Sequence, residues 1–342
     1  MKYITFAIPS YNSEAYLHHA VDTILSGGED VEIIIVNDGS KDGTAAIADA
    51  YVEKYPTIVK AVHKPNGGHG SGVNRGLQEA TGLYYKVVDS DDWVDEKALQ
   101  ELLLTVKRHV SKGIEADLYI TNFVYDHVED NTQKCRSWES KFPVGRIFGW
   151  EEVKPFVGHQ TLLMHNLMYK VEPLRASGVM LPEHTFYVDN LFAYQPLPYM
   201  KKLFYLNVNL YHYFIGRADQ SVNINNFVKR YDQQIRVMNC MLEAYTYDEL
   251  MAMVPGLRKY MLQQLCAIMM NTIMFCCSGG DDEERRAAYQ KMWDDLKARD
   301  PKLYDLVCHK HLPALSTWMP WKMRGQFMLY GYKALCKILK LG

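Results

Sequence analysis

The sequence predicts an α/β protein with a mostly parallel sheet flanked by helices, followed by a helical C-terminal region. Over residues 1–95, short apolar runs alternate with segments of helical spacing. This alternation is typical of parallel strands joined by right-handed crossover helices. From about residue 226, apolar residues recur at helical intervals to the end. The 342 residues, 48% of them hydrophobic, suffice for one large domain or one and a half.

The expected elements follow in order. Strands are predicted where a short apolar run is bounded by polar or turn-forming residues, at 4–8, 31–36, 58–62, 84–88 and 117–125. Helices are predicted where apolar residues share one face, at 13–25, 44–55, 72–80 and 96–110. We expect irregular loops or hairpins at 126–160, short apolar runs with turns at 161–215, and a break between helices at 279–282.

The acidic segment 89–92 is the most informative feature of the chain. It directly follows an apolar strand and contains Asp89, Asp91 and Asp92. Like charges this close repel one another, so a cation is needed to compensate them. Mg²⁺ and Mn²⁺ take oxygen ligands and bridge carboxylates to phosphates, which predicts a metal–diphosphate site. The alternative is an acidic turn that caps the helix expected from residue 96.

Polar loops follow each of the first four predicted strands, at residues 9–12, 37–40, 65–68 and 89–92. Parallel strands bring such loops to one edge of the sheet, where ligands bind in open α/β folds. The sequence therefore predicts a pocket at this edge.

Two of these loops have features that suit a nucleotide. Asp38 can accept a hydrogen bond from a nucleobase N–H, and Gly39 permits a sharp turn and a close approach. A tight turn with Asp42 or Thr44 as helix cap is the alternative. Residues 66–72 form a glycine-rich stretch whose backbone N–H groups suit phosphate.

The glycine-rich stretch is neither a P-loop, because no Lys follows it, nor a dinucleotide fingerprint, because it follows the third strand. Arg75, in the helix after it, meets a diphosphate or pairs with an exposed acid, and both interpretations stay open. Asp189 is the candidate general base, with helix capping as its alternative role. His212, Arg217 and Ser221 lie in a turn-rich run, and His212 taken alone is typical of a packing residue.

In this order, the motifs resemble those of family 2 glycosyltransferases with the GT-A fold, over about residues 1–222. The resemblance rests on Ile8-Pro9-Ser10-Tyr11-Asn12, the run from Val36 to Thr44, Asn66-Gly67-Gly68, Asn74-Arg75-Gly76, Asp89-Ser90-Asp91-Asp92, Asp189, and Arg217 with Ser221. It implies an inverting transferase that uses a nucleotide-diphosphate sugar, with UDP the expected nucleotide, and a divalent metal, Mn²⁺ or Mg²⁺.

The resemblance also implies residue roles. It assigns nucleotide binding to Pro9, Tyr11, Asn12, Glu14, Asp38, Gly39, Asn66, Gly67, Gly68, Asn74, Arg75, Asp89 and Ser90. It makes Asp89 and Asp91 the metal pair and Asp189 the base, and we expect Glu183, His212, Arg217 and Ser221 near the acceptor or diphosphate. The family usually has Glu before the base, whereas this chain has Val188. Glu183 therefore stays an alternative base, and we favour Asp189.

We expect a GT-A catalytic domain at residues 1–222, with a nucleotide-sugar half at about 1–110 and an acceptor half at about 111–222. The helical region 223–342 is rich in methionine between residues 238 and 274. Adaptable core packing is the favoured explanation, and a groove for a glycan or lipid-linked acceptor is the alternative. Residues 318–342 combine basic and bulky apolar side chains. They lie on an anionic membrane surface or dock on the chain itself, and both hypotheses stay open.

Composition narrows the function classes. A net charge of −2 gives no signature of nucleic-acid binding. The seven cysteines show no metal or disulfide spacing, and no signal-peptide pattern or run of 18 apolar residues occurs. We therefore expect a reduced, cytoplasmic protein, at the inner face of the membrane or away from it. The family resemblance implies that it is an enzyme of surface polysaccharide synthesis that acts on a nucleotide sugar. The alternatives are a non-catalytic nucleotide-sugar-binding protein and a sugar nucleotidyltransferase.

Overall fold

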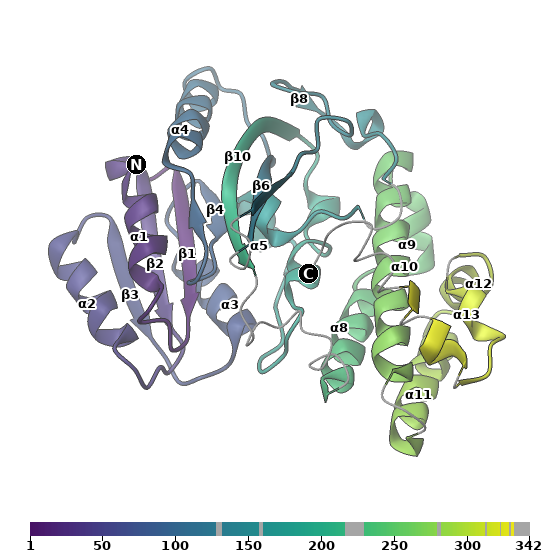
Figure 1. Ribbon diagram of the computed structural model, residues 1–342. Coiled ribbons are helices and arrows are strands. Elements are labelled where there is room, and N and C mark those ends of the chain that lie inside the picture. Colours follow the sequence, from purple (N-terminus) through teal and green to yellow (C-terminus); the bar gives the residue numbers. More distant parts are fainter. Residues whose placement is uncertain are drawn as a thin grey trace. The chain divides into compact units, whose positions relative to one another are not determined.

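The computed structural model describes residues 1–127, 132–156, 160–215, 229–278, 282–311, 313–321, 323–327 and 330–331. The chain divides into two units, residues 1–154 with 162–215, and residues 155–161 with 216–342. The elements of the first unit (Figure 1) are β1 (Ile4–Ser10), α1 (Leu17–Leu25), η1 (Gly28–Asp30), β2 (Val31–Asn37), α2 (Thr44–Lys54), β3 (Val59–His63), α3 (His69–Glu79), β4 (Tyr84–Val87), β5 (Trp93–Val94), α4 (Glu96–Ser111), β6 (Leu118–His127), β7 (Thr132–Arg136), β8 (Ile147–Phe148), η2 (Trp150–Glu152), η3 (Met164–Asn166), β9 (Leu167–Lys170), α5 (Val171–Ala176), α6 (Asp189–Phe192), η4 (Leu197–Tyr199) and β10 (Leu203–Ile215). Those of the second are α8 (Tyr231–Ala244), α9 (Tyr247–Ala252), α10 (Pro255–Cys277), α11 (Glu283–Arg299), α12 (Pro301–His309) and α13 (Ala314–Thr317).

One sheet runs through the first unit in the order β3-β2-β1-β4-β9-β6-β10-β5, with β7 paired to β6 and β8 to β10. β1 pairs in parallel with β2 and β4, and β2 with β3. β9 is antiparallel to both β4 and β6, and β10 is parallel to β6. β1, β2, β3, β4, β6 and β10 therefore all run in one direction. This confirms the predicted mostly parallel α/β fold.

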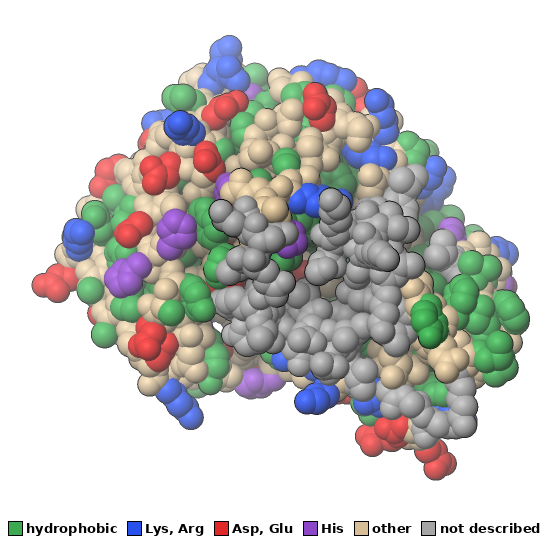
Figure 2. Space-filling view, in the orientation of Figure 1, with side chains coloured by type: hydrophobic (Ala, Val, Ile, Leu, Met, Phe, Trp, Pro, Cys, Tyr) green, Lys and Arg blue, Asp and Glu red, His purple; other side chains and the backbone are tan. Residues whose placement is uncertain are grey.

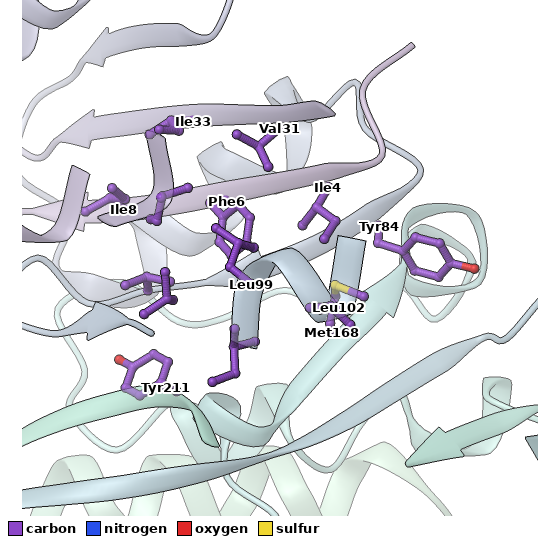
Figure 3. Packing of buried hydrophobic residues seen from close by; sticks show 14 of the residues in the cluster. Ile4, Phe6, Ile8, Val31, Ile33, Tyr84, Leu99, Leu102, Met168 and Tyr211 are labelled. Atoms are coloured by element: carbon purple, nitrogen blue, oxygen red, sulfur yellow. The ribbon is translucent and has the colours of Figure 1, made fainter. Parts of the chain in front are cut away.

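The alternation of side chains along β1 explains how helices cover the sheet. Ile4, Phe6 and Ile8 point to one face, where they join a buried cluster with residues of α1 and α4 (Figure 3). Ala7 points to the other face and meets α3, where a Cβ on Gly76 would lie 2.6 Å from the Ala7 Cβ. The absence of a side chain at Gly76 thus lets α3 approach the strand closely.

Two helix boundaries differ from the sequence prediction. The helix expected from residue 13 begins at Leu17, and the one expected from residue 72 begins at His69. The glycine-rich stretch is therefore a loop only as far as Gly68. The glycines after it serve close packing of α3, because a Cβ on Gly72 would lie 2.8 Å from the Pro9 Cβ.

The region 126–160, expected to hold loops or hairpins, contains β7, β8 and η2 in its described part. β6 extends to His127, and its end pairs antiparallel with β7. The described residues of this region thus contain an antiparallel strand pair, the arrangement that a hairpin requires.

In the second unit, α10 forms much of the core. Five methionines of the methionine-rich stretch are buried, namely Met238, Met241, Met261, Met269 and Met274, which agrees with the packing interpretation. By length and composition, α10 could cross a membrane, but 72% of its apolar window is buried inside the protein. Core helices of soluble proteins pass the same test, so this is weak evidence for a span.

The cysteines and the apolar residues near the chain end can be compared with the sequence predictions. Cys266, Cys276, Cys277 and Cys308 are buried and unpaired, as expected, whereas Cys135 in the first unit is exposed. Apolar side chains reach the surface around α12 and α13 (Figure 2). They include Leu315, Trp318, Met323, Phe327 and Tyr330. Most of the expected break at 279–282 lies outside the described residues.

Candidate active site

The acidic loop follows β4 and is anchored from β10. The Tyr211 hydroxyl donates to Asp92 and accepts from the Asp89 N–H at 3.2 Å, and the Phe214 N–H donates to Asp92 Oδ1 at 2.9 Å. The cap of α4 is Asp95, whose carboxylate accepts from the Ala98 N–H at 2.8 Å. The capping interpretation of the acidic segment is therefore wrong, because a different aspartate does that work.

His69, the first residue of α3, connects the glycine loop to the acidic loop. Its Nε2 atom lies 2.7 Å from Asp89 Oδ1. Burial lowers the pKa of His69, but the charges of Asp89, Asp189 and Asp91 outweigh burial, and the pKa is raised overall. One imidazole thus responds to carboxylates from two segments about 100 residues apart. Sequence analysis assigned His69 no role, although its place at the start of a helix beside a carboxyl-end loop was a signal.

Asp189 begins the short helix α6, whose cap is Val188. It is not the capping residue of that helix, contrary to the alternative considered from sequence. Burial raises the pKa of Asp189, and the neighbouring His69 only partly opposes this. Glu183 is exposed and accepts a hydrogen bond from the Ser71 hydroxyl at 2.8 Å. A carboxylate with a raised pKa is better suited to take up a proton near neutral pH. Asp189 as the base stays a prediction, with Glu183 as its alternative.

Asp38 organises the glycine loop. Its carboxylate is buried and accepts from the Gly67 N–H at 2.9 Å, the Gly68 N–H at 2.7 Å and Lys64 Nζ at 2.6 Å. The Asn66 side chain donates to the Asp38 carbonyl at 2.9 Å. Sequence analysis overlooked Lys64. A nucleobase contact of Asp38 stays a prediction.

The loops after β1 and β2 are fastened to each other. The Asn12 N–H donates to Ser40 Oγ at 3.0 Å, and the Lys41 N–H donates to Asn12 Oδ1 at 2.9 Å. The Gly43 N–H donates to Glu14 Oε2 at 2.6 Å. Asn12 and Glu14 therefore hold the predicted nucleotide loops in register before any ligand binds.

Ser90 and the first loop also meet. The hydroxyls of Ser13 and Ser90 lie 2.7 Å apart, which connects the acidic loop to the loop after β1. Pro9 packs against Gly72, and the Tyr11 side chain is half exposed. An exposed ring beside these loops suits stacking with a base.

Five further candidates have other partners or lie outside the described residues. Asn74 exchanges two hydrogen bonds with the backbone of Leu181, and Arg75 pairs with Glu79 at 2.6 Å. His212 Nδ1 lies 2.7 Å from Asp126 Oδ2, and its ring stacks on Trp93. Arg217 and Ser221 lie outside the described residues.

Among the described residues, Asp89, Asp92 and His165 form a group able to hold a metal ion, with one potential ligand atom from each within 4.8 Å of the others. Asp89 belongs to the predicted metal pair. Asp92 and His165 do not, and Asp91 is not in this group. Sequence analysis missed His165 because it is about 75 residues away from the acidic loop.

Comparisons with known proteins relate this chain to glycosyltransferases. The model of glycosyl transferase family 2 matches residues 5–171. The putative glycosyltransferase EpsH of Bacillus subtilis is 25% identical over 245 residues, which cover 68% of this chain and 64% of EpsH. The uncharacterized glycosyltransferase MG025 homolog of Mycoplasma pneumoniae is 28% identical over 77% of this chain and 86% of that protein. The chain therefore spans less than two thirds of EpsH.

A solved structure shares the fold. TarS residues 1–349 of S. aureus, in complex with UDP-GlcNAc, superimposes with a TM-score of 0.62 and 18% identity, over 90% of this chain and 84% of the other.

Proposed function

Because this chain belongs to glycosyl transferase family 2, we propose that it transfers a sugar from a nucleotide-diphosphate sugar, with UDP as the nucleotide, to a hydroxyl of a glycan or lipid-linked acceptor. The observation that carries this proposal is the position of His69. It is hydrogen-bonded to Asp89 and interacts electrostatically with Asp91 and Asp189. The carboxylates assigned to the donor diphosphate and to the base therefore belong to one site.

The reaction follows from these residues. Asp189 removes the proton from the acceptor hydroxyl, and the resulting oxygen attacks the anomeric carbon as the bond to the diphosphate breaks. Attack from the face opposite the leaving group inverts the configuration, so an α-linked donor gives a β-glycoside. A Mn²⁺ or Mg²⁺ ion held by Asp89 and Asp91 would neutralise charge on the departing diphosphate. Asp38 fixes the conformation of the glycine loop by accepting the Gly67 and Gly68 N–H groups.

The biological setting is part of the proposal. We assign residues 1–222 as the catalytic domain and residues 223–342 as a helical region. We place the protein in the cytoplasm, in surface polysaccharide synthesis. The exposed apolar residues that follow α12 are available for peripheral membrane contact, and docking of the chain end on the protein is the other hypothesis.

A donor screen tests the proposal. We expect slow release of nucleoside diphosphate from one UDP-sugar in a panel of UDP- and GDP-sugars. This release should stop with EDTA and in Asp91→Ala, and persist in the matched control Asp49→Ala, whose exposed side chain pairs with His63.

Other outcomes would redirect the assignment. Tight UDP binding without turnover of any donor, even with cell-derived acceptors, would favour the binding protein. Formation of a nucleotide sugar from a sugar phosphate and a nucleoside triphosphate would favour the nucleotidyltransferase.

A further inference from the structure

His165 is a buried histidine beside the acidic loop with an unused ring nitrogen. It lies in η3, just before β9, and only 7% of the residue is exposed. Its Nδ1 atom is buried and has no hydrogen-bond partner among the described residues. Buried polar atoms without a partner are uncommon in folded proteins and often indicate an ion or ligand.

The surroundings of His165 supply the other ligands. A ring nitrogen of His165 lies within 4.8 Å of one carboxylate oxygen each from Asp89 and Asp92. His69 is bonded to only one Asp89 oxygen. Both oxygens of Asp92 already accept hydrogen bonds from β10. Asp89 is therefore the better-placed carboxylate to share a cation with His165, and Asp92 is better suited to anchor the loop.

His165 is also held firmly in place. The buried Lys86 ammonium donates to the His165 carbonyl oxygen at 2.7 Å. The imidazole packs on the rings of Tyr211 and Tyr213, with centroids 4.5 and 4.8 Å away. The neutral imidazole is the form that binds metals.

We propose that His165 supplies a nitrogen ligand to the divalent ion at Asp89, giving a mixed carboxylate–imidazole centre. The inference rests on the proposed function for the presence of an ion. An imidazole nitrogen suits transition-metal ions, whereas Mg²⁺ prefers oxygen. The site should therefore bind Mn²⁺ or Co²⁺ more tightly than Mg²⁺, beyond what the acidic loop alone would give.

Pulsed electron paramagnetic resonance of Mn²⁺ added to the full chain tests this directly. We expect modulation from a directly bound nitrogen, which changes when the histidines are labelled with ¹⁵N. The matched variants are His165→Gln and His69→Gln, the same substitution at the two histidines that face Asp89. The nitrogen signal should vanish in His165→Gln and persist in His69→Gln. Mn²⁺ affinity should fall in His165→Gln by roughly 10–100-fold, and the preference for Mn²⁺ over Mg²⁺ should shrink.

Each other outcome has a distinct meaning. Bound Mn²⁺ without nitrogen modulation in the unaltered protein would refute the His165 ligand while leaving the proposed transferase intact, and this needs no variant to fold. Loss of the signal in His69→Gln alone would assign the nitrogen to His69 instead. If no Mn²⁺ binds the unaltered protein, both this inference and metal dependence fail, and UDP-sugar turnover in EDTA then shows whether transfer itself survives.

Discussion

The floor of the candidate site and helix α10 are both deeply buried, yet they bury opposite kinds of side chain. The floor contains Lys86 and Asp92, which are 0% and 1% exposed, and His165. The buried residues of α10 include no charged side chain, and its cysteines, methionines and aliphatic residues fill the interior. Burying an ionisable group costs several kcal/mol unless partners compensate it. The contrast agrees with a functional role proposed for the floor and with a packing role for α10.

The pKa shifts express the same contrast. Burial lowers the pKa of Lys86 to about 7, and burial with the charges of Asp91 and Asp89 raises that of Asp92 well above its usual range. Burial raises the pKa of the Cys266 thiol in α10 to about 12, so this thiol merely stays neutral. Charge states are adjustable at the site and fixed in α10.

Asp189→Asn should give the largest effect, because the amide cannot accept the proton of the acceptor hydroxyl. We expect sugar transfer to fall by about 10²–10⁴-fold, with UDP affinity measured by calorimetry nearly unchanged. In the unaltered enzyme the rate should fall as the pH drops through the raised pKa of Asp189, so the acid limb lies above the ordinary range for aspartate. Near-normal turnover by Asp189→Asn would return Glu183 to the role of base.

Lys86→Met tests whether burial in the floor of the site lowers the pKa of Lys86. The folded pKa of Lys86 is about 7, whereas an unfolded lysine titrates near 10.4. Between these values the unfolded chain binds more protons, so the stability owed to Lys86 is complete above pH 10.4 and is lost as the pH falls toward 7. As the pH rises from 7 to about 10.4, the free energy of unfolding of the unaltered protein should increase relative to that of Lys86→Met. The increase should be on the order of 5 kcal/mol, since each pKa unit is worth about 1.4 kcal/mol.

Urea unfolding at several pH values between 7 and 10 measures this difference. The control is Lys291→Met, at an exposed lysine of α11 paired with Asp295. This variant removes an exposed lysine charge by the same substitution, so its pH dependence is the reference for Lys86→Met. An equal pH dependence of the two variants would mean that Lys86 is not held at a lowered pKa.

Much of the fold over residues 1–95 could be predicted from sequence, because its signals are local. Apolar runs identify β1 to β4, and the polar residues that follow them necessarily share one edge of a parallel sheet. The insertion of β9 between β4 and β6 could not be predicted, because antiparallel pairing of distant segments leaves no local pattern.

The same limit applies to the floor of the site. Lys86, His165 and Tyr211 come from three segments that only this strand order brings together. In sequence, Lys86 is a single polar residue in an apolar strand, and His165 has no motif around it. The acidic loop could be identified from sequence, but its buried partners could not.

Gly39→Ala, compared with Gly113→Ala, distinguishes the effect of backbone strain on stability from an effect of the glycine loop on UDP binding. Gly39 has φ of +72°, and a Cβ there would lie 2.9 Å from the Asn66 backbone nitrogen. Gly113 has φ of +65° with nothing within 4 Å of its Cβ position. Both alanine variants should lose about 1–2 kcal/mol of stability. Only Gly39→Ala should weaken UDP binding, because the added Cβ displaces the glycine loop. If this displacement costs about 1.4 kcal/mol of binding free energy, UDP affinity should fall on the order of tenfold. Equal UDP affinity in the two variants would mean that this loop does not contribute to nucleotide binding.

The smallest expected effect concerns a buried polar side chain of α10, which differs from the apolar residues around it. Gln264 is 1% exposed, and neither atom of its amide has a hydrogen-bond partner among the described residues. If α10 is structural, Gln264→Leu should stabilise the protein by roughly 1 kcal/mol, because it removes an uncompensated buried amide. The matched control is Gln234→Leu in α8, where the amide donates to Thr272 Oγ1 at 3.1 Å and the same substitution should destabilise.

Thermal unfolding and transfer assays on this pair decide between the two interpretations of the methionine-rich region. Unchanged transfer in a stabilised Gln264→Leu protein would confirm α10 as packing. A loss of transfer to the acceptor, with donor hydrolysis intact, would show that the buried amide is reserved for an acceptor. In that case α10 would resemble the floor of the site, because both would bury polar groups that take part in binding or catalysis.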